Sequence, residues 1–425
     1  MRTTLARRAA TLIACGGLVI ACGGLVIACS GLGLATPALA QDKQDKTVKI
    51  GVLNDLSSLY ADIGGANSVI AVKMAVQDSG LPDKGWKIDV LSGDHQNKPD
   101  VGVNIARQWI DVDKVDAVVD TPNSGVALAV SNLVKEKNSI LINSGGASAD
   151  LTGKACTPNT LSVSYDTYML AHGTGAALTK AGGDTWFFLT SDYAFGYALE
   201  RDTSAVVTAN GGKVIGGVKH PINSSDFSSF LLQAQASKAK VIGLANAGGD
   251  TTNAIKQAAE FGIVAGGQKL AALLLFINDV HALGLNTAQG LSFTESFYWD
   301  MNDQTRAWSK KLSAQSKTGS MPSMTVAGLY SGVLHYLKTL EAMGGNPHDG
   351  AKVVARMKEL PTDDVLFGKG TIRADGRKML PAYLFEVKKP EESKYPWDYY
   401  KLVATIPAEE AARPLSESDC PLVKK

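Results

Sequence analysis

The stretch TVKIGVLNDLSSLYADIGGANSVIAVKMAVQD, residues 47–78, decides the fold class. Its first part, VKIGVL (48–53), is an apolar and β-branched run that is typical of a buried strand. A polar loop follows, and a helix is expected at about 66–79 because apolar residues recur there at spacings of three and four: Val69, Val72 and Val76. A strand, a loop and a helix in this order form the repeating unit of a parallel α/β sheet.

The same alternation continues along the chain. Further strands are expected at 86–94, 115–120 and 139–144, and again at 185–191, 213–220, 239–247 and 269–277. Helices are expected between them, at 101–110, 126–138, 197–210 and 251–262. Alternation at this spacing predicts an α/β protein with two doubly wound parallel-sheet lobes, and no linker separates them.

The chain changes character after about Thr294. A long helix is expected at 325–345, because apolar residues fall on one face of it and Gly344–Gly345 would end it. Its apolar face would carry Leu329, Val333, Tyr336, Leu340 and Met343. The segment 368–390 is expected to form strands joined by an Asp-Gly turn.

Polar and glycine-rich clusters follow the carboxyl ends of six expected strands: NDLSSLY (54–60), GDHQN (93–97), DTPNSG (120–125), SGGAS (144–148), SDYAFG (191–196) and NAGGD (246–250). In open parallel sheets the ligand lies beyond these ends of the strands. Such clusters are also what loops between strands and helices look like in any fold of this class, so they locate a cleft without proving its use.

The N-terminal segment has the order of an export signal, with Arg2, Arg7 and Arg8 before an apolar run at about 11–35. The small residues of TPALAQD predict cleavage before Gln41, so that residues 1–40 form the signal peptide of an exported protein. An uncleaved membrane anchor is an alternative, because the run is long enough to span a bilayer. A second alternative is a lipoprotein, because VIAC, ending at Cys29, resembles a lipobox.

Without residues 1–40 the count of Lys and Arg falls by three, from 42 to 39, against 41 Asp and Glu. A slightly acidic chain argues against nucleic acid as a partner. Two cysteines remain, Cys156 and Cys420, and an even pair in an exported protein predicts a disulfide. Two unpaired thiols are the alternative.

The order of these motifs resembles the type I periplasmic solute-binding proteins of the leucine, isoleucine and valine class, over about residues 45–405. The resemblance implies two lobes joined by three crossings, near 164–166, 294–296 and 365–368. The first lobe would comprise 47–165 plus 295–365, and the second 166–294 plus 366–405, with 406–425 as a tail. It also implies a monomer that binds one small solute and delivers it to the permease of an ABC importer.

The resemblance further implies which residues meet the solute. In amino-acid binders of this family the first lobe holds the ligand carboxylate, here at Asn123, Ser124, Gly145, Gly146 and Ser148. The last three residues stand where a helix should begin, and free N–H groups there would independently favour an anion. In those relatives a glutamate binds the ammonium group of the ligand, and Asp250 stands at the position of that glutamate here. Ile63 replaces an aromatic residue that would lie over the ligand.

Some relatives with a pattern like AGGDT look like binders of aromatic carboxylates, which is the alternative ligand class. Aromatic side chains near the expected cleft could sandwich a ring: Tyr60, Tyr165, Tyr193, Phe195, Tyr298 and Trp299. Packing in loops or at the hinge is the other interpretation, particularly for Tyr298 and Trp299. A buried Asp250 beside a ligand without an amine would be a poorly compensated charge, which favours amino acids.

An enzyme is not expected. The six histidines include no pair at metal-binding spacing, Ser144 lacks the glycine of a nucleophile elbow at Ile142, and NAGGD and SGGAS lack the lysine of a phosphate loop. Asp94 and Asp120 could form a carboxylate pair, but Asp at a strand end is usually a turn residue. No metal or cofactor is expected. A membrane sensor is the third alternative, if the apolar run at 11–35 stays attached.

Overall fold

The apolar run at 48–53 forms the second strand of a five-stranded parallel sheet with the order β2-β1-β3-β4-β5. Its members are β1 (Thr47–Asn54), β2 (Lys87–Asp94), β3 (Ala117–Asp120), β4 (Ile140–Asn143) and β5 (Thr160–Ser162). The computed structural model describes residues 45–424 of the chain. Both neighbours of β1 run parallel to it, so the polar residues after each strand come to the same edge of the sheet.

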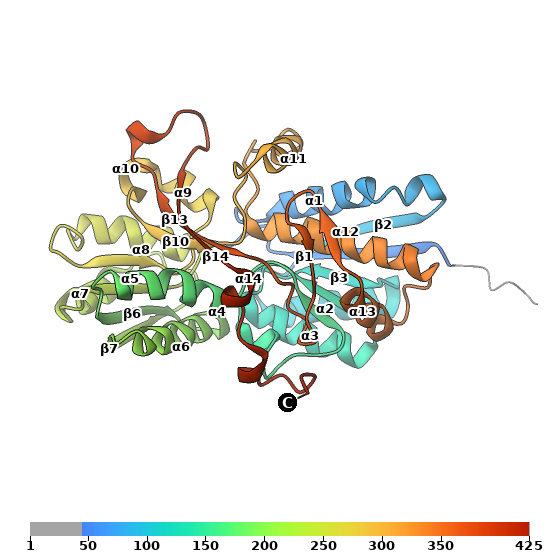
Figure 1. Ribbon diagram of the computed structural model, residues 1–425, viewed down its shortest axis with the longest axis horizontal. Helices are drawn as coiled ribbons and strands as arrows, with labels where there is room; N and C mark the ends of the chain where they lie inside the picture. Colours follow the sequence, from blue (N-terminus) through green and yellow to red (C-terminus); the bar gives the residue numbers. More distant parts are fainter. Residues whose placement is uncertain (1–44, 425) are drawn as a thin grey trace, which may run out of the picture. The chain divides into compact units, whose positions relative to one another are not determined.

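Helices cover both faces of this sheet, as the sequence predicts for a doubly wound lobe (Figure 1). On one face α1 (Gly65–Asp78) packs against α12 (Met324–Met343), which joins the lobe from far along the chain. α13 (Gly350–Glu359) packs against α12. On the other face α2 (Pro99–Gln108) and α3 (Ser124–Lys137) lie together and bury Trp109. We call this sheet with these helices the first lobe.

The second lobe is built on a four-stranded parallel sheet with the order β7-β6-β8-β9. The strands are β6 (Thr185–Ser191), β7 (Lys213–His220), β8 (Val241–Ala245) and β9 (Lys269–Ala272). The helices of this part of the chain are α4 (Thr167–Leu170), α5 (Ala176–Lys180), α6 (Ala194–Ala209), α7 (Ser228–Ala236), α8 (Gly249–Glu260), α9 (Ile277–Leu283) and α10 (Leu285–Ala288). The predicted alternation of strands and helices is therefore confirmed in both lobes.

The prediction of one strand over 269–277 is wrong in its second half. β9 ends at Ala272, and α9 begins at Ile277. The residues between them are as buried as a strand, with Leu273 and Leu275 fully inaccessible, so their apolar character alone could not reveal the break. The side chain of Asp279 accepts a hydrogen bond from the backbone N–H of Phe276 at 2.9 Å and thereby fixes the start of α9.

A third, antiparallel sheet follows the second lobe in the order β10-β13-β14. Its strands are β10 (Ser292–Glu295), β13 (Ala382–Val387) and β14 (Tyr400–Ile406), while β11 (Thr362–Asp364) and β12 (Gly368–Gly370) form a separate hairpin. The predicted Asp-Gly turn is confirmed at Gly376, whose φ is 86°. It joins no long hairpin, because the residues around it form only isolated bridges. Helix α11 (Asp303–Ser313) packs against α1, and a short α14 (Ala408–Ala411) follows β14.

The chain passes from the first lobe to the second between β5 and α4, and back again between β10 and α11. The segment 372–378 still lies beside β5, since Ser162 forms a parallel bridge with Arg377. We therefore propose the lobe boundaries expected from the sequence with one change, in which the third crossing lies after Lys378.

The signal peptide and Cys29 lie outside the described residues. Within 45–424, no helix has both the length and the apolar character needed to cross a membrane.

Candidate functional site

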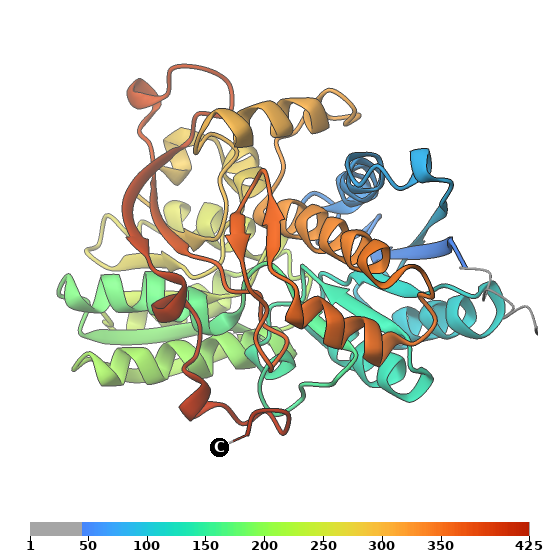
Figure 2. The same ribbon diagram turned by 45° about the vertical axis from the view of Figure 1, so that its right-hand side comes forward.

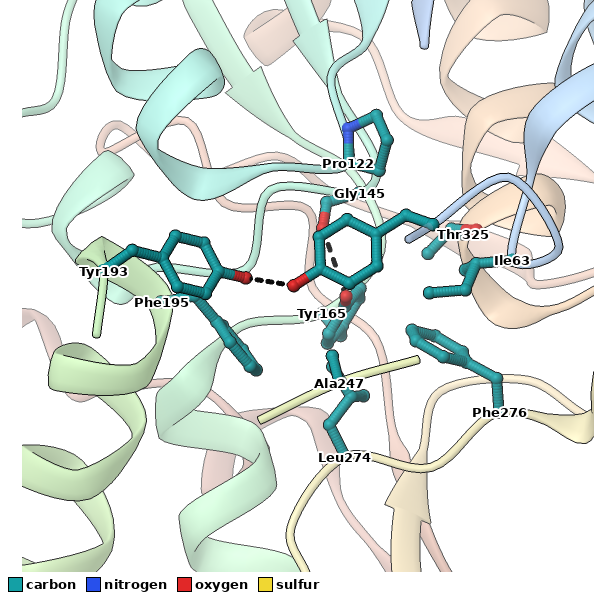
Figure 3. A pocket seen from close by; sticks show the side chains of 11 residues that line it. Ile63, Pro122, Gly145, Tyr165, Tyr193, Phe195, Ala247, Leu274, Phe276 and Thr325 are labelled. Carbon is teal, nitrogen blue, oxygen red and sulfur yellow. Dashed lines mark hydrogen bonds between the residues drawn. The ribbon is translucent and has the colours of Figure 1, made fainter. Parts of the chain in front are cut away.

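A small cavity lies where the two lobes meet, at the carboxyl ends of their strands. It is lined by Tyr60, Ile63, Pro122, Gly145, Tyr165, Tyr193, Phe195, Ala247, Leu274, Phe276 and Thr325. In Figure 3, Tyr193 and Phe195 approach it from the side opposite Ile63 and Thr325. Its volume is about 10 Å³, which is room for about one water molecule. The protein's own side chains therefore leave little room at this point between the lobes.

Tyr60 is the first-lobe residue at the centre of this site, and Asp55 positions it. The buried carboxylate of Asp55 accepts hydrogen bonds from the backbone N–H groups of Ser58 and Tyr60, both at 2.8 Å. These bonds fold the loop after β1 into a turn that directs the phenol toward the second lobe. The Tyr60 hydroxyl lies 2.5 Å from the hydroxyl of Tyr193, and this hydrogen bond joins the two lobes at the cavity.

Tyr193 and Phe195 come from the start of α6, directly after β6. Burial raises the pKa of Tyr60 and of Tyr193, so both phenols stay protonated at neutral pH. A protonated phenol can donate one hydrogen bond and accept others. The two phenols can therefore donate hydrogen bonds to a carboxylate or accept one from an N–H group when the hydrogen bond between them opens.

Gly248, in the loop between β8 and α8, allows the second lobe to approach Tyr60 closely. Its φ of 57° and ψ of −131° suit glycine alone. A Cβ atom at this position would lie 3.0 Å from the carbonyl oxygen of Leu59 and 3.1 Å from Cδ1 of Tyr60. The glycine of NAGGD thus permits a close approach between the lobes.

Tyr165 supplies a third phenol, near the first crossing. Its hydroxyl donates to the carbonyl oxygen of Gly145 at 3.1 Å, and its ring meets that of Phe276 edge-on at 6.1 Å. Burial raises the pKa of Tyr165 as well.

Asp120 begins one first-lobe loop that reaches the cavity and holds the two others, which follow β1 and β4. Its carboxylate accepts from Ser144 Oγ at 2.8 Å and from Asn54 Nδ2 at 2.5 Å, and burial raises its pKa to about 6. Asp120 and Thr121 both have positive φ, 86° and 59°, which turns the chain sharply before Pro122. Asp94 lies apart and accepts from the backbone N–H groups of Leu56 and Gln96, so the two carboxylates do not form a pair.

The expected anion site has no free N–H group at any of its three positions, and Gly145 N donates to the carbonyl oxygen of Asp120 at 3.4 Å. Gly146 N donates to Asn143 Oδ1 at 2.8 Å, and Ser148 N donates to Ser124 Oγ at 3.1 Å. The expected helix is also wrong, because only a short 3-10 turn follows at Ala149–Leu151. Asn123 caps α3 through its side-chain oxygen. Of the five residues expected to hold a carboxylate, only Gly145 lines the cavity.

Asp250 lies in the first turn of α8, fully buried and behind the cavity wall. Its carboxylate accepts from the backbone N–H groups of Asn223 and Ser224, at 3.1 and 2.8 Å. Burial raises its pKa to about 7 in spite of these two bonds. Its charge acts on both Tyr60 and Tyr193, so it belongs to the surroundings of the site without lining it.

Tyr298 and Trp299 do not reach the cavity. Both donate to the carbonyl oxygen of Trp397, at 3.1 and 2.9 Å, and the Tyr298 ring stacks on Tyr400. In this structure the pair packs against the loop before β14 and the first residue of that strand, as the loop-packing interpretation expects.

Five lining residues were not singled out by sequence reasoning, although the first two lie in the predicted loop clusters: Pro122, Ala247, Leu274, Phe276 and Thr325. Leu274 and Phe276 belong to the run that the sequence indicates as a strand. Thr325 stands at the start of α12, and no local signal shows that this helix points at the cleft.

Comparison with known proteins gives a consistent result. Residues 47–393 match the family model described as periplasmic binding protein. A crystal structure of a periplasmic binding protein from Burkholderia mallei is 52% identical, with a TM-score of 0.86 over 89% of this chain and 100% of that one.

Two further proteins add names that mention a ligand. A branched chain amino acid ABC transporter periplasmic ligand-binding protein from Burkholderia xenovorans is 41% identical, with a TM-score of 0.78 over 89% of this chain and 100% of that one. A Leu/Ile/Val-binding protein homolog of Brucella melitensis is 24% identical, over 84% of this chain and 91% of its own length. The matched proteins are binding proteins, so the prediction that the chain is not an enzyme is confirmed.

Proposed function

The chain belongs to the periplasmic binding protein family, and from that premise we propose that it is the solute-binding component of an ABC importer. The observation that carries the proposal is the cavity lined from both lobes, with Tyr60 and Tyr193 meeting across it. A solute that contacts both lobes would favour their closure by the difference between its contacts in the closed and open arrangements. The closed arrangement would then be presented to a membrane permease.

We propose a branched-chain or related amino acid as the solute. Ile63, Leu274 and Phe276 offer an apolar wall for a branched side chain. The hydroxyl groups of Tyr60, Tyr193 and Thr325 are donors for a carboxylate, in place of the paired N–H groups of the 144–148 loop. Because the space is about 10 Å³, entry requires the lobes to part and the bond between Tyr60 and Tyr193 to open.

The charge around the site favours a solute with an ammonium group. Among residues 45–424, no Lys or Arg lines the cavity. Buried acids lie around its three phenols instead: Asp120, Asp250, Asp279 and Glu295. An anion without a positive group would meet no counter-charge there, whereas an ammonium group would favour the ionised form of Asp250.

A second candidate is an aromatic carboxylate in the same transport role. The rings of Tyr165, Tyr193, Phe195 and Phe276 surround the cavity and could enclose a ring. Asp250 would then stay protonated, which its pKa of about 7 permits.

The substitution Asp250→Asn separates these two candidates. After a thermal-shift screen of amino acids and aromatic acids, calorimetry would compare wild type and variant for each solute that binds. We expect Asp250→Asn to weaken binding of an amino acid by tenfold or more, since about 1.4 kcal/mol of ion pairing corresponds to tenfold, and to spare an aromatic acid. Asp226→Asn, an exposed change in the same lobe, is the control. Unchanged amino-acid affinity would rule out the amine role.

A further inference from the structure

The C-terminal segment after β14 begins on the second lobe. α14 packs against the helical turn Ala171–Gly175. Arg413 then anchors the segment, because its guanidinium donates to Asp202 on α6 at 3.2 Å and lies 4.9 Å from the centre of the Tyr168 ring. Its carbonyl oxygen accepts from Arg373, in the segment 372–378 beside β5 of the first lobe, at 2.8 Å, so the part of the tail that can bridge the lobes begins here. Asp202 is buried, so this anchor is a partly desolvated ion pair rather than a loose surface contact.

The same segment ends on the first lobe. Cys420 forms a disulfide with Cys156, with the two Cα atoms 5.6 Å apart. Cys156 lies between the turn Ala149–Leu151 and β5, which precedes the first crossing. Both cysteines are buried, at 6% and 3% exposure. The predicted pairing is thus present, and it joins the C-terminal tail, which is anchored on the second lobe, to the first lobe.

We propose that residues 413–420 form a covalent strap that limits how far the two lobes can separate. The three chain crossings hold the lobes together at the hinge, and this strap is a fourth connection, closed by a side-chain bond. In Figures 1 and 2 the dark red segment leaves α14 and runs down to the C-terminus between α6 and α3. The inference needs two lobes that move, but it does not depend on which solute binds.

The noncovalent contact beside the strap is weak by comparison. Arg201 on α6 donates to Asp150 of the first lobe at 2.8 Å, and the Arg201 side chain is 45% exposed. Exposed pairs of this kind contribute little to stability and are screened by salt. A disulfide is a covalent bond, so it would stay intact when this ion pair opens.

The length of the strap determines how far the two lobes could separate. Six residues separate Arg413 from Cys420, and a fully extended chain of this length spans roughly 25 Å. The strap contains the short turn Leu415–Glu417, so it could lengthen only if this turn unwinds. It would therefore permit partial opening and resist wide opening, which raises the share of molecules that are already close to the closed arrangement.

Distance measurement between two spin labels tests the strap without any solute. Noncanonical ketone residues at Glu136 on α3 and Thr208 on α6, both exposed, would carry the labels and leave the cysteines untouched. We expect the double variant Cys156→Ser, Cys420→Ser to show a mean distance longer by several ångströms and a broader distribution. Arg413→Ala, which frees the strap from α6 but keeps the disulfide, should give an intermediate result.

Loss of a disulfide also lowers stability, so circular dichroism must show that each variant is folded at the temperature used. Arg356→Ala removes an exposed ion pair on α13 of the first lobe and is the control, which should match wild type. Identical distance distributions in wild type and in the folded double variant would overturn the proposal. This failure would leave the solute-binding role intact, since that role is tested by calorimetry.

Discussion

At the scale of single residues, the site depends on buried acids that form no ion pair with a basic residue among residues 45–424. Asp250 shows this most clearly, because burial raises its pKa to about 7 although two backbone N–H groups donate to it. A carboxyl group whose pKa is higher in the folded state than its usual 3.8 stabilises the fold at pH values below 3.8, and this contribution is lost as the pH rises through about 7. The protein thus keeps an acid close to ionisation beside the phenols of Tyr60 and Tyr193.

This titration predicts how solute affinity depends on pH. An ammonium group binds the ionised form, so amino-acid affinity should rise by up to about tenfold between pH 6 and pH 8, in line with the change in the ionised fraction. The affinity of an aromatic carboxylate should fall over the same range. Calorimetry at three pH values measures this.

The pH experiment must distinguish Asp250 from Asp279, because burial raises the pKa of Asp279 to about 7 as well. Asp250→Asn should flatten the pH profile if Asp250 is the responsible group. A profile that keeps its slope in this variant would assign the dependence to another acid.

At the scale of helices and strands, close approach explains residues that propensity alone would not favour. Gly51 lies on β1, inside the sheet, where glycine weakens a strand. A Cβ atom there would lie 2.4 Å from Cε3 of Trp109, the indole that fills the space between the sheet and α2. The glycine therefore makes room for the largest side chain on that face.

The substitution Gly51→Ala should reduce the free energy of unfolding by about 1–3 kcal/mol, since overpacking in a filled core has this cost. In a Trp109→Leu background the same change should cost less, because the obstructing ring is gone. Urea denaturation of the four proteins in this cycle gives the coupling between the two sites. Equal costs in both backgrounds would show that Trp109 is not the obstacle.

The strands and helices of both sheets could be predicted because their apolar periodicity is strong. The exception, Leu273–Phe276, is buried like a strand but leads into α9, and only the bond from Phe276 N to Asp279 marks the change. In the site, Tyr60, Gly145 and Tyr193 could be predicted from loops at strand ends. Thr325 could not, since its place depends on how α12 packs against α1.

The polar residues of the expected site show a second limit of predicting a site from sequence. Ser124, Gly146 and Ser148 have the residue types of an anion site, but they hydrogen bond to one another's loops and to Asn143. A hydroxyl or a glycine has the same sequence signal whether its partner is a solute or the protein itself. Which of the two it meets is decided by distances that sequence does not contain.

At the scale of the whole molecule, the central claim is that a solute is held by both lobes at once. Tyr60 of the first lobe and Tyr193 of the second meet at 2.5 Å, and neither alone can enclose a ligand. A solute held by one lobe would be affected by substitutions in that lobe only. One held by both should respond to substitutions on either side.

The most direct test is calorimetric titration of the best solute from the screen into wild type, Tyr60→Phe and Tyr193→Phe. We expect one binding site in wild type, and at least fivefold weaker binding in each variant, because each loses a buried hydroxyl that the solute contacts, at a cost of about 1 kcal/mol or more. Tyr197→Phe, which alters an exposed hydroxyl on α6, should leave binding unchanged. Wild-type affinity in both Tyr60→Phe and Tyr193→Phe would contradict the account.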